Sequence, residues 1–152
     1  MTELTVHDAS VGTGRDTPTA PLPSAAVSAL ARLDLKLAAP AIVRAVTVYE
    51  IATARYDELI ARPASTLSGA EFDSLTSAQD RLTEAFTILA EAGRLDLIAP
   101  AETAGRYRLA SLDCRRAAAQ SDFDSCLVAQ DEMRMCRCQL EQAGRLDLIG
   151  VA

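Results

Sequence analysis

The chain has 152 residues, a formal net charge of −6 and a hydrophobic fraction of 49%. That length allows one compact domain or two small repeated units, and the hydrophobic fraction argues against global disorder. The acidic balance argues against binding to nucleic-acid phosphates, which requires clustered lysine and arginine. No apolar run approaches the roughly 20 residues that cross a bilayer, and the N-terminus lacks a secretory-signal pattern. We therefore expect a cytoplasmic protein without nucleic-acid or membrane partners. The richness in alanine and arginine indicates a GC-rich, bacterial genome.

The residue types on which most enzymes depend are scarce. The only histidine is His7, near the N-terminus, and the only lysine is Lys36. Without a histidine in the folded part, the usual general base, its nucleophile pairs and histidine-containing zinc sites are missing. The chain also lacks the glycine motifs that bind phosphates or dinucleotides. The sequence therefore predicts a protein that is not an enzyme and holds neither a cofactor nor a metal.

Taken in chain order, the sequence predicts a tail followed by helices. Residues 1–23 are rich in Thr, Gly, Pro and Asp, a composition typical of a disordered tail. From residue 24 to residue 152 glycine and proline are sparse, and no β-branched run is bounded by hairpin turns. Helix-terminus signals divide this part into five predicted helices, near residues 24–37, 41–62, 69–92, 101–119 and 122–143.

Side-chain caps are predicted at two of the helix starts. Ser68 and Glu71 have the spacing of a capping box, in which each side chain bonds to the other residue's backbone amide. Ser121 and Asp124 have the same spacing with a shorter acid. We expect both pairs to begin helices.

An internal repeat is the most informative feature of the sequence. Residues 71–100 align without a gap on residues 122–151, and roughly 14 of the 30 positions are identical at a constant offset of 51. Gly93 and Gly144 occupy equivalent positions, where a left-handed helix cap is expected. The repeat predicts an all-α fold: an antiparallel helical bundle of two tandem hairpins, approximately 41–100 and 101–152, plus an N-terminal helix.

A stripe of alternating large and small side chains runs along each repeated helix. In the first copy leucines at seven-residue spacing alternate with alanines (Leu75, Ala78, Leu82, Ala85, Leu89, Ala92). The second copy keeps the alternation (Cys126, Ala129, Met133, Cys136, Leu140, Ala143). We expect the two hairpins to share a four-helix core. The segment ARLDLKLAAP at 31–40 echoes residues 92–100, which suggests that the first helix is a truncated third copy.

The heptapeptide AGRLDLI occurs twice and supports two interpretations. As a recognition element it would present charged pairs at one end of each hairpin (Arg94, Asp96, Arg145, Asp147). Alternatively, it is a structural segment in which a helix cap is followed by apolar residues that pack back on the helix (an apolar latch). In that case it occurs twice because the whole hairpin was duplicated. The second interpretation predicts that Leu95, Leu97 and Ile98 are buried while the charged side chains face solvent.

The predicted fourth helix is the most basic stretch of this acidic chain. It carries four arginines within eleven residues (Arg106, Arg108, Arg115, Arg116). They are interpreted either as a surface face that pairs with acidic helices or as a docking patch for an acidic protein.

All four cysteines lie in the second repeat (Cys114, Cys126, Cys136, Cys138). Cys136 and Cys138 are two residues apart, so on a helix they point to nearly opposite sides and cannot hold one ion together. Cys114 and Cys126 are equidistant from residue 120, where the turn between the last two helices is predicted. In an antiparallel hairpin their sulfurs would come within disulfide range, although free thiols are expected in a reducing compartment.

The sequence favours a non-enzymatic helical protein-interaction module, such as an adaptor, regulator or inhibitor of a protein partner, with self-association as a second mode. One alternative is a thiol-based redox or metal sensor that uses the four cysteines. Another is a carrier of a small apolar ligand held between the hairpins.

Overall fold

The structure is a computed structural model that describes residues 24–150, so the predicted tail at 1–23 lies outside the described residues. The described part contains five α-helices and no strand, which confirms the all-α prediction there. The long elements are α1 (Ser24–Leu37), α2 (Pro40–Ile60), α3 (Gly69–Glu91), α4 (Ala99–Ala119) and α5 (Phe123–Gln142). Each lies within two residues of its predicted bounds. No helix among residues 24–150 is both long and apolar enough to cross a membrane.

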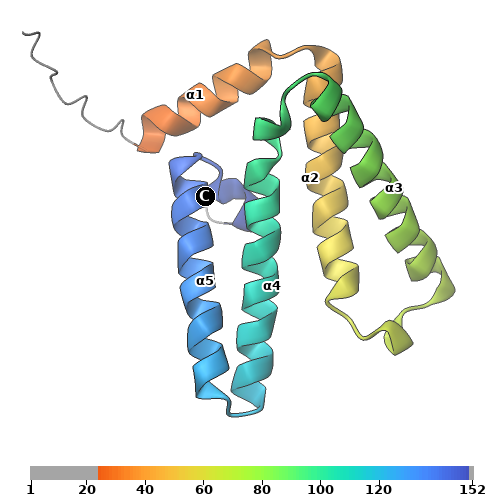
Figure 1. Cartoon of the computed structure of the whole chain (residues 1–152), viewed down its shortest axis with the longest axis vertical. Coiled ribbons are helices and arrows are strands. Elements are labelled where there is room, and N and C mark those ends of the chain that lie inside the picture. Colours follow the sequence, from red (N-terminus) through yellow and green to blue (C-terminus); the bar gives the residue numbers. More distant parts are fainter. Residues whose placement is uncertain (1–23, 151–152) are drawn as a thin grey trace, which may run out of the picture.

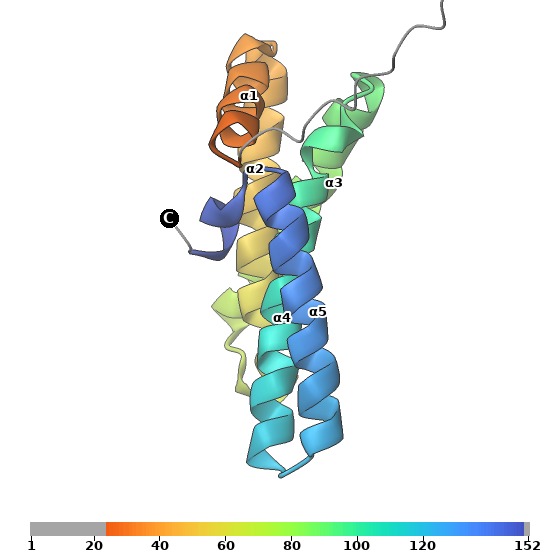
Figure 2. The ribbon, with the colours of Figure 1, turned by 90° about the vertical axis from the view of Figure 1, so that its left-hand side faces the viewer.

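The four longest helices lie side by side in the order α3, α2, α4, α5 (Figure 1). The helix α2 packs along α3, and α4 packs along α5. Turned by 90°, the row is seen from its α5 end, with α1 near the top (Figure 2). The sequence predicts one shared four-helix core, whereas here α2 and α4 provide the main helix-to-helix contact between the two pairs. The stripe of alternating large and small side chains on α3 therefore packs mainly against α2, and the stripe on α5 packs mainly against α4.

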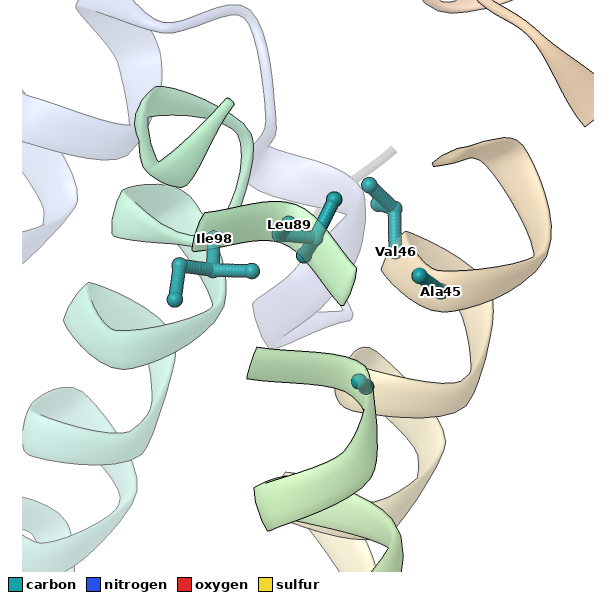
Figure 3. Close-up of a cluster of buried hydrophobic side chains, with 5 residues drawn as sticks. Ala45, Val46, Leu89 and Ile98 are labelled. Atoms are coloured by element: carbon teal, nitrogen blue, oxygen red, sulfur yellow. The ribbon is translucent and has the colours of Figure 1, made fainter. Parts of the chain in front are cut away.

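A compact apolar cluster holds α2, α3 and the start of α4 together. Ala45 and Val46 of α2 meet Leu89 of α3 and Ile98, as the close-up shows (Figure 3). Leu89 is fully buried, and burying a leucine side chain contributes about 1.5–3 kcal/mol. Leu35 of α1 packs against the edge of this cluster, so α1 is anchored across one end of the helices (Figure 1).

The segments after α3 and α5 have the same local structure. Gly93 and Gly144 both have φ of 66°, a conformation that glycine adopts without steric cost. In each copy the next residue, Arg94 or Arg145, donates its amide to a carbonyl five residues earlier, at 2.8 Å. A single 3₁₀ turn follows, η2 (Leu95–Leu97) in one copy and η3 (Leu146–Ile149) in the other. These are the predicted left-handed caps, and both are confirmed.

The two predicted capping boxes have different outcomes. Ser68 and Glu71 form the box in full at the start of α3. The prediction for Ser121 and Asp124 is wrong, because Asp122 is the N-cap of α5. Its side chain accepts a hydrogen bond from the backbone amide of Ser125. Ser121 instead has φ of 58° and serves as the left-handed residue that ends α4. It therefore cannot also take the extended conformation that a helix N-cap requires.

A third short 3₁₀ turn, η1 (Ala64–Thr66), connects α2 to α3. The RLDL sequence of α1 does not form such a turn, although its letters match η2 and η3. It continues as α-helix through Leu37, because alanine at position 31 stands where the other copies have the glycine that ends the helix. The echo in α1 is therefore not a third copy of the capping structure.

Candidate functional site

The two RLDL segments that follow α3 and α5, at residues 94–97 and 145–148, connect different elements of this chain through ion pairs. The guanidinium of Arg94 lies 3.1 Å from Asp96 of its own segment and 2.7 Å from Asp34 of α1. Arg145 repeats the local pair with Asp147, at 3.1 Å. Its second carboxylate is Glu50 of α2, at 2.8 Å. Four of the residues predicted to bind a partner thus contact each other or neighbouring helices of the same chain.

The side chain of Arg145 is less exposed to solvent than that of Arg94. Burial lowers the pKa of Arg145, but the carboxylates of Glu50 and Asp147 outweigh this effect and raise it above the usual value. Glu50 Oε1 is itself buried, and its ion pair with Arg145 compensates its charge. This pair joins the C-terminal turn to the first helix pair.

The predicted apolar latch is confirmed only in part. Ile98 is 3% exposed, and Leu97 packs against the apolar cluster of α2 and α3. Leu95, predicted to be buried, is 40% exposed. A 3₁₀ turn has three residues per turn, so consecutive side chains point in directions about 120° apart and cannot all face one core.

The four arginines of α4 do not form one continuous basic patch. Arg106 donates to Gln139 of α5, and Arg115 bonds only to Ser111 on its own helix. Arg116 donates to the carbonyl of Ala61, beyond the end of α2. Arg106 and Arg116 also lie 3.6 Å from acidic side chains, namely Glu132 and Asp113. These contacts match the interpretation in which the arginines pair within the molecule.

Arg108 forms a partly buried polar contact between α4 and α2. Its guanidinium donates twice to Asp57 Oδ2 of α2, at 2.8 and 3.1 Å, and also to the carbonyl of Leu148. Gly105 permits this close approach, since a Cβ there would lie 3.1 Å from the same carboxylate oxygen. Asp57 was missed as a candidate. The available signal was that Asp57 and Arg108 occupy equivalent positions of the repeat and carry opposite charges.

A tyrosine adds a second polar link between α2 and α4. The hydroxyl of Tyr49 donates to Glu102 at 3.3 Å. Burial, together with the nearby carboxylate of Glu102, raises the pKa of Tyr49 from 10.0 to about 12. The side chain therefore stays a neutral hydrogen-bond donor over the physiological range.

The four cysteines divide into a close pair and two separate residues. The sulfurs of Cys114 and Cys126 are 2.9 Å apart, which confirms their predicted proximity, and both are free thiols. Cys136 is buried and Cys138 is exposed. Cys136 lies about 15 Å further along α5 than Cys126, at 1.5 Å per residue. Among the described residues, no three metal-ligating side chains of the His, Cys, Asp and Glu types are grouped to hold an ion.

Two surface grooves lie close to the candidate residues. One of about 800 Å³ lies between α4 and α5 and includes Leu109 and Val128 among charged side chains such as Arg106, Asp113 and Glu132. Another, of about 460 Å³, lies where α1 meets both RLDL segments and includes Asp34 and Arg145. Both are lined by mixed polar and apolar groups.

Comparison with known proteins finds no relative with which these features can be compared. No protein-family model, no curated protein and no solved structure matches the chain.

Proposed function

We propose that this chain is a non-enzymatic protein-interaction module that docks on its partner through α1. The observation that carries the proposal is a stripe of three leucines on that helix, which we call the α1 stripe. Leu30, Leu33 and Leu37 are 54%, 52% and 77% exposed. Their spacing places them on one side of the helix, as in helices that dock in apolar grooves.

The α1 stripe faces away from the rest of the molecule. At 100° per residue, Leu35 lies on the opposite side of the helix from the stripe. Leu35 packs against the apolar cluster of α2 and α3. One side of α1 is therefore anchored while the other presents three large apolar side chains to water. Clustered apolar exposure of this kind marks interaction surfaces in soluble proteins.

The charged residues support a scaffolding role for the remainder of the molecule. Arg94, Arg108 and Arg145 each pair with carboxylates of this chain across element boundaries. Such pairs hold α1, the two helix pairs and the C-terminal turn in register. In this proposal they position α1 and are not themselves the docking surface.

The architecture is best explained by duplication of a helix hairpin, with α2 and α3 as one copy and α4 and α5 as the other. Support comes from the constant offset of 51 and from the matching caps at Gly93 and Gly144. A single hairpin of this size buries too little apolar surface to fold alone, so the copies stabilise each other. We place the module in a reducing compartment, such as the bacterial cytoplasm, where free thiols are the resting state of its cysteines.

A carrier of apolar ligands has less support. The groove between α4 and α5 is large enough for a small molecule, but Arg106, Asp113 and Glu132 line it. Moving an apolar ligand beside these charges would remove water from them without replacing its hydrogen bonds.

The proposal is tested by sizing the tagged full chain after native purification from the cells that encode it. Leu33→Asp combined with Leu37→Asp is compared with Phe72→Asp, which changes an exposed apolar residue on α3. Each buried leucine contributes about 1.5–3 kcal/mol, so the double variant should bind at least about a hundredfold more weakly.

We expect the unchanged chain and Phe72→Asp to elute in a complex, and the double variant to elute alone with an unchanged helical spectrum. A complex at a multiple of the chain mass identifies a second copy as the partner, and any other mass identifies a different protein. The proposal is wrong if the unchanged chain elutes alone or if the double variant keeps the complex.

A further inference from the structure

The pair of thiols at the end of the second helix pair has a geometry that the docking proposal does not use. Cys114 lies in the second-last turn of α4, and Cys126 lies in the first turn of α5. Their sulfurs are 2.9 Å apart, shorter than ordinary contact between two sulfur atoms, and both side chains are partly exposed. A small reagent can therefore reach two sulfur atoms that already lie next to each other.

We propose that Cys114 and Cys126 are a reversible disulfide site that locks α4 to α5 when the chain meets a small-molecule disulfide such as oxidised glutathione. One thiolate of the pair attacks the reagent, forms a mixed disulfide and releases one glutathione. The other thiolate attacks the cysteine sulfur of this mixed disulfide, which forms the Cys114–Cys126 bond, breaks the bond to glutathione and releases the second glutathione. The two protons lost by the cysteines protonate the two glutathione thiolates, and the reagent gains the two electrons that the cysteines lose.

The neighbouring side chains support this assignment. Gln130, one turn after Cys126, directs its amide nitrogen to both sulfurs, 3.5 Å from Cys126 and 3.9 Å from Cys114. The shared proton of Cys114, and to a lesser degree desolvation, raise the pKa of Cys126. The Cys126 thiol is therefore protonated near neutral pH, which suits slow exchange with a cellular disulfide pool better than rapid capture of an oxidant.

The site is particular to the second repeat. The equivalent positions in the first repeat are Pro63 and Leu75, so a disulfide there is impossible. Oxidation would close a loop of only about a dozen residues across the turn between α4 and α5, at the end of the molecule away from α1 (Figure 1). Because such a cross-link restricts the unfolded chain, we expect it to raise Tm by about 10 °C.

The test uses the full chain, incubated with oxidised glutathione and then mapped by peptide mass spectrometry without reduction. Cys114→Ser and Cys126→Ser are the test variants, and Cys138→Ser is the matched control because Cys138 is the exposed thiol elsewhere on α5. We expect the unchanged chain and Cys138→Ser to lose two hydrogen atoms, to yield the peptide pair joined through Cys114 and Cys126, and to gain thermal stability.

Neither test variant should form the internal bond or show the rise in Tm. The map of the unchanged chain decides the matter even if a variant folds poorly. The inference is overturned if Cys114 and Cys126 remain alkylatable after oxidation, or if the linked peptides join other cysteines. It does not depend on the docking role of α1, so sizing of the complex and peptide mapping fail independently.

Discussion

Single residues in the left-handed conformation end three of the long helices. Gly93 and Gly144 do so after α3 and α5, and Ser121 does so after α4. A side chain in this conformation costs about 1–2 kcal/mol, because its Cβ approaches the following carbonyl oxygen. The chain therefore carries local strain at Ser121 that it avoids at the two glycines.

This difference predicts opposite effects when glycine is introduced at position 121 and when it is removed from position 93. Ser121→Gly should stabilise the protein by about 0.5–1 kcal/mol, whereas Gly93→Ala should destabilise it by about 1–2 kcal/mol. Gly69→Ala is the control, because Gly69 has ordinary backbone angles and open space around its Cβ position. Urea unfolding measures all three free energies. A loss of stability in Ser121→Gly would contradict the assigned role of Ser121.

The capping box at the start of α3 predicts an unusually acidic carboxyl group. Hydrogen bonds from the Ser68 backbone and from the Arg62 side chain lower the pKa of Glu71 from 4.5 to about 2. Because this pKa is lower in the folded chain, the associated stability is present above pH 4.5 and is lost as the pH falls through about 2.

NMR titration of the Glu71 carboxyl carbon should give a midpoint near 2. Arg62→Gln should move the midpoint part of the way back toward the ordinary value, since the backbone contribution remains. Arg55→Gln, which removes the partner of Glu58 instead, should leave it unchanged. An ordinary midpoint in the unchanged chain would show that the box is not formed in solution.

At the scale of elements, the contact between α2 and α4 combines small side chains with one partly buried ion pair. Ala52, Ala101, Ala104 and Gly105 are all buried in these two helices. Small residues let helix backbones approach closely, and the approach brings Arg108 to Asp57.

A double-mutant cycle on this pair tests its contribution to stability. Asp57→Asn and Arg108→Gln should each cost about 1–3 kcal/mol, because each leaves a charge without its partner. The double variant should cost clearly less than the sum of the two. Arg115→Gln is the control and should change stability by less than about 0.5 kcal/mol, because Arg115 bonds only within α4. Additive losses would mean that the pair is not coupled in solution.

At the scale of the whole molecule, sequence patterns predict local structure better than they predict how the helix pairs associate. Gly93, Gly144 and the Ser68 box are recognisable because each feature depends on neighbouring residues only. The proximity of Cys114 and Cys126 follows from their equal distance to one turn.

The features that the sequence left open depend on contacts between distant segments. The pairing of Asp57 with Arg108 and of Glu50 with Arg145 requires knowledge of which helices meet, as does the order of helices in the row. Leu95 is exposed because of the geometry of a short turn, which an apolar pattern does not encode. Ser121 and Asp122 compete for one role in a short connection, and only the backbone angles show which residue takes it.

The docking role of the α1 stripe is tested most directly by site-specific photo-crosslinking in the cells that encode the chain. A photoreactive amino acid replaces Leu33 in one variant and Phe72 of α3 in the other, both exposed apolar positions. We predict that irradiation joins position 33 to one defined protein, either a partner or a second copy, and that position 72 gives no such adduct. The absence of an adduct at position 33, or the same set of adducts at both positions, would contradict the account.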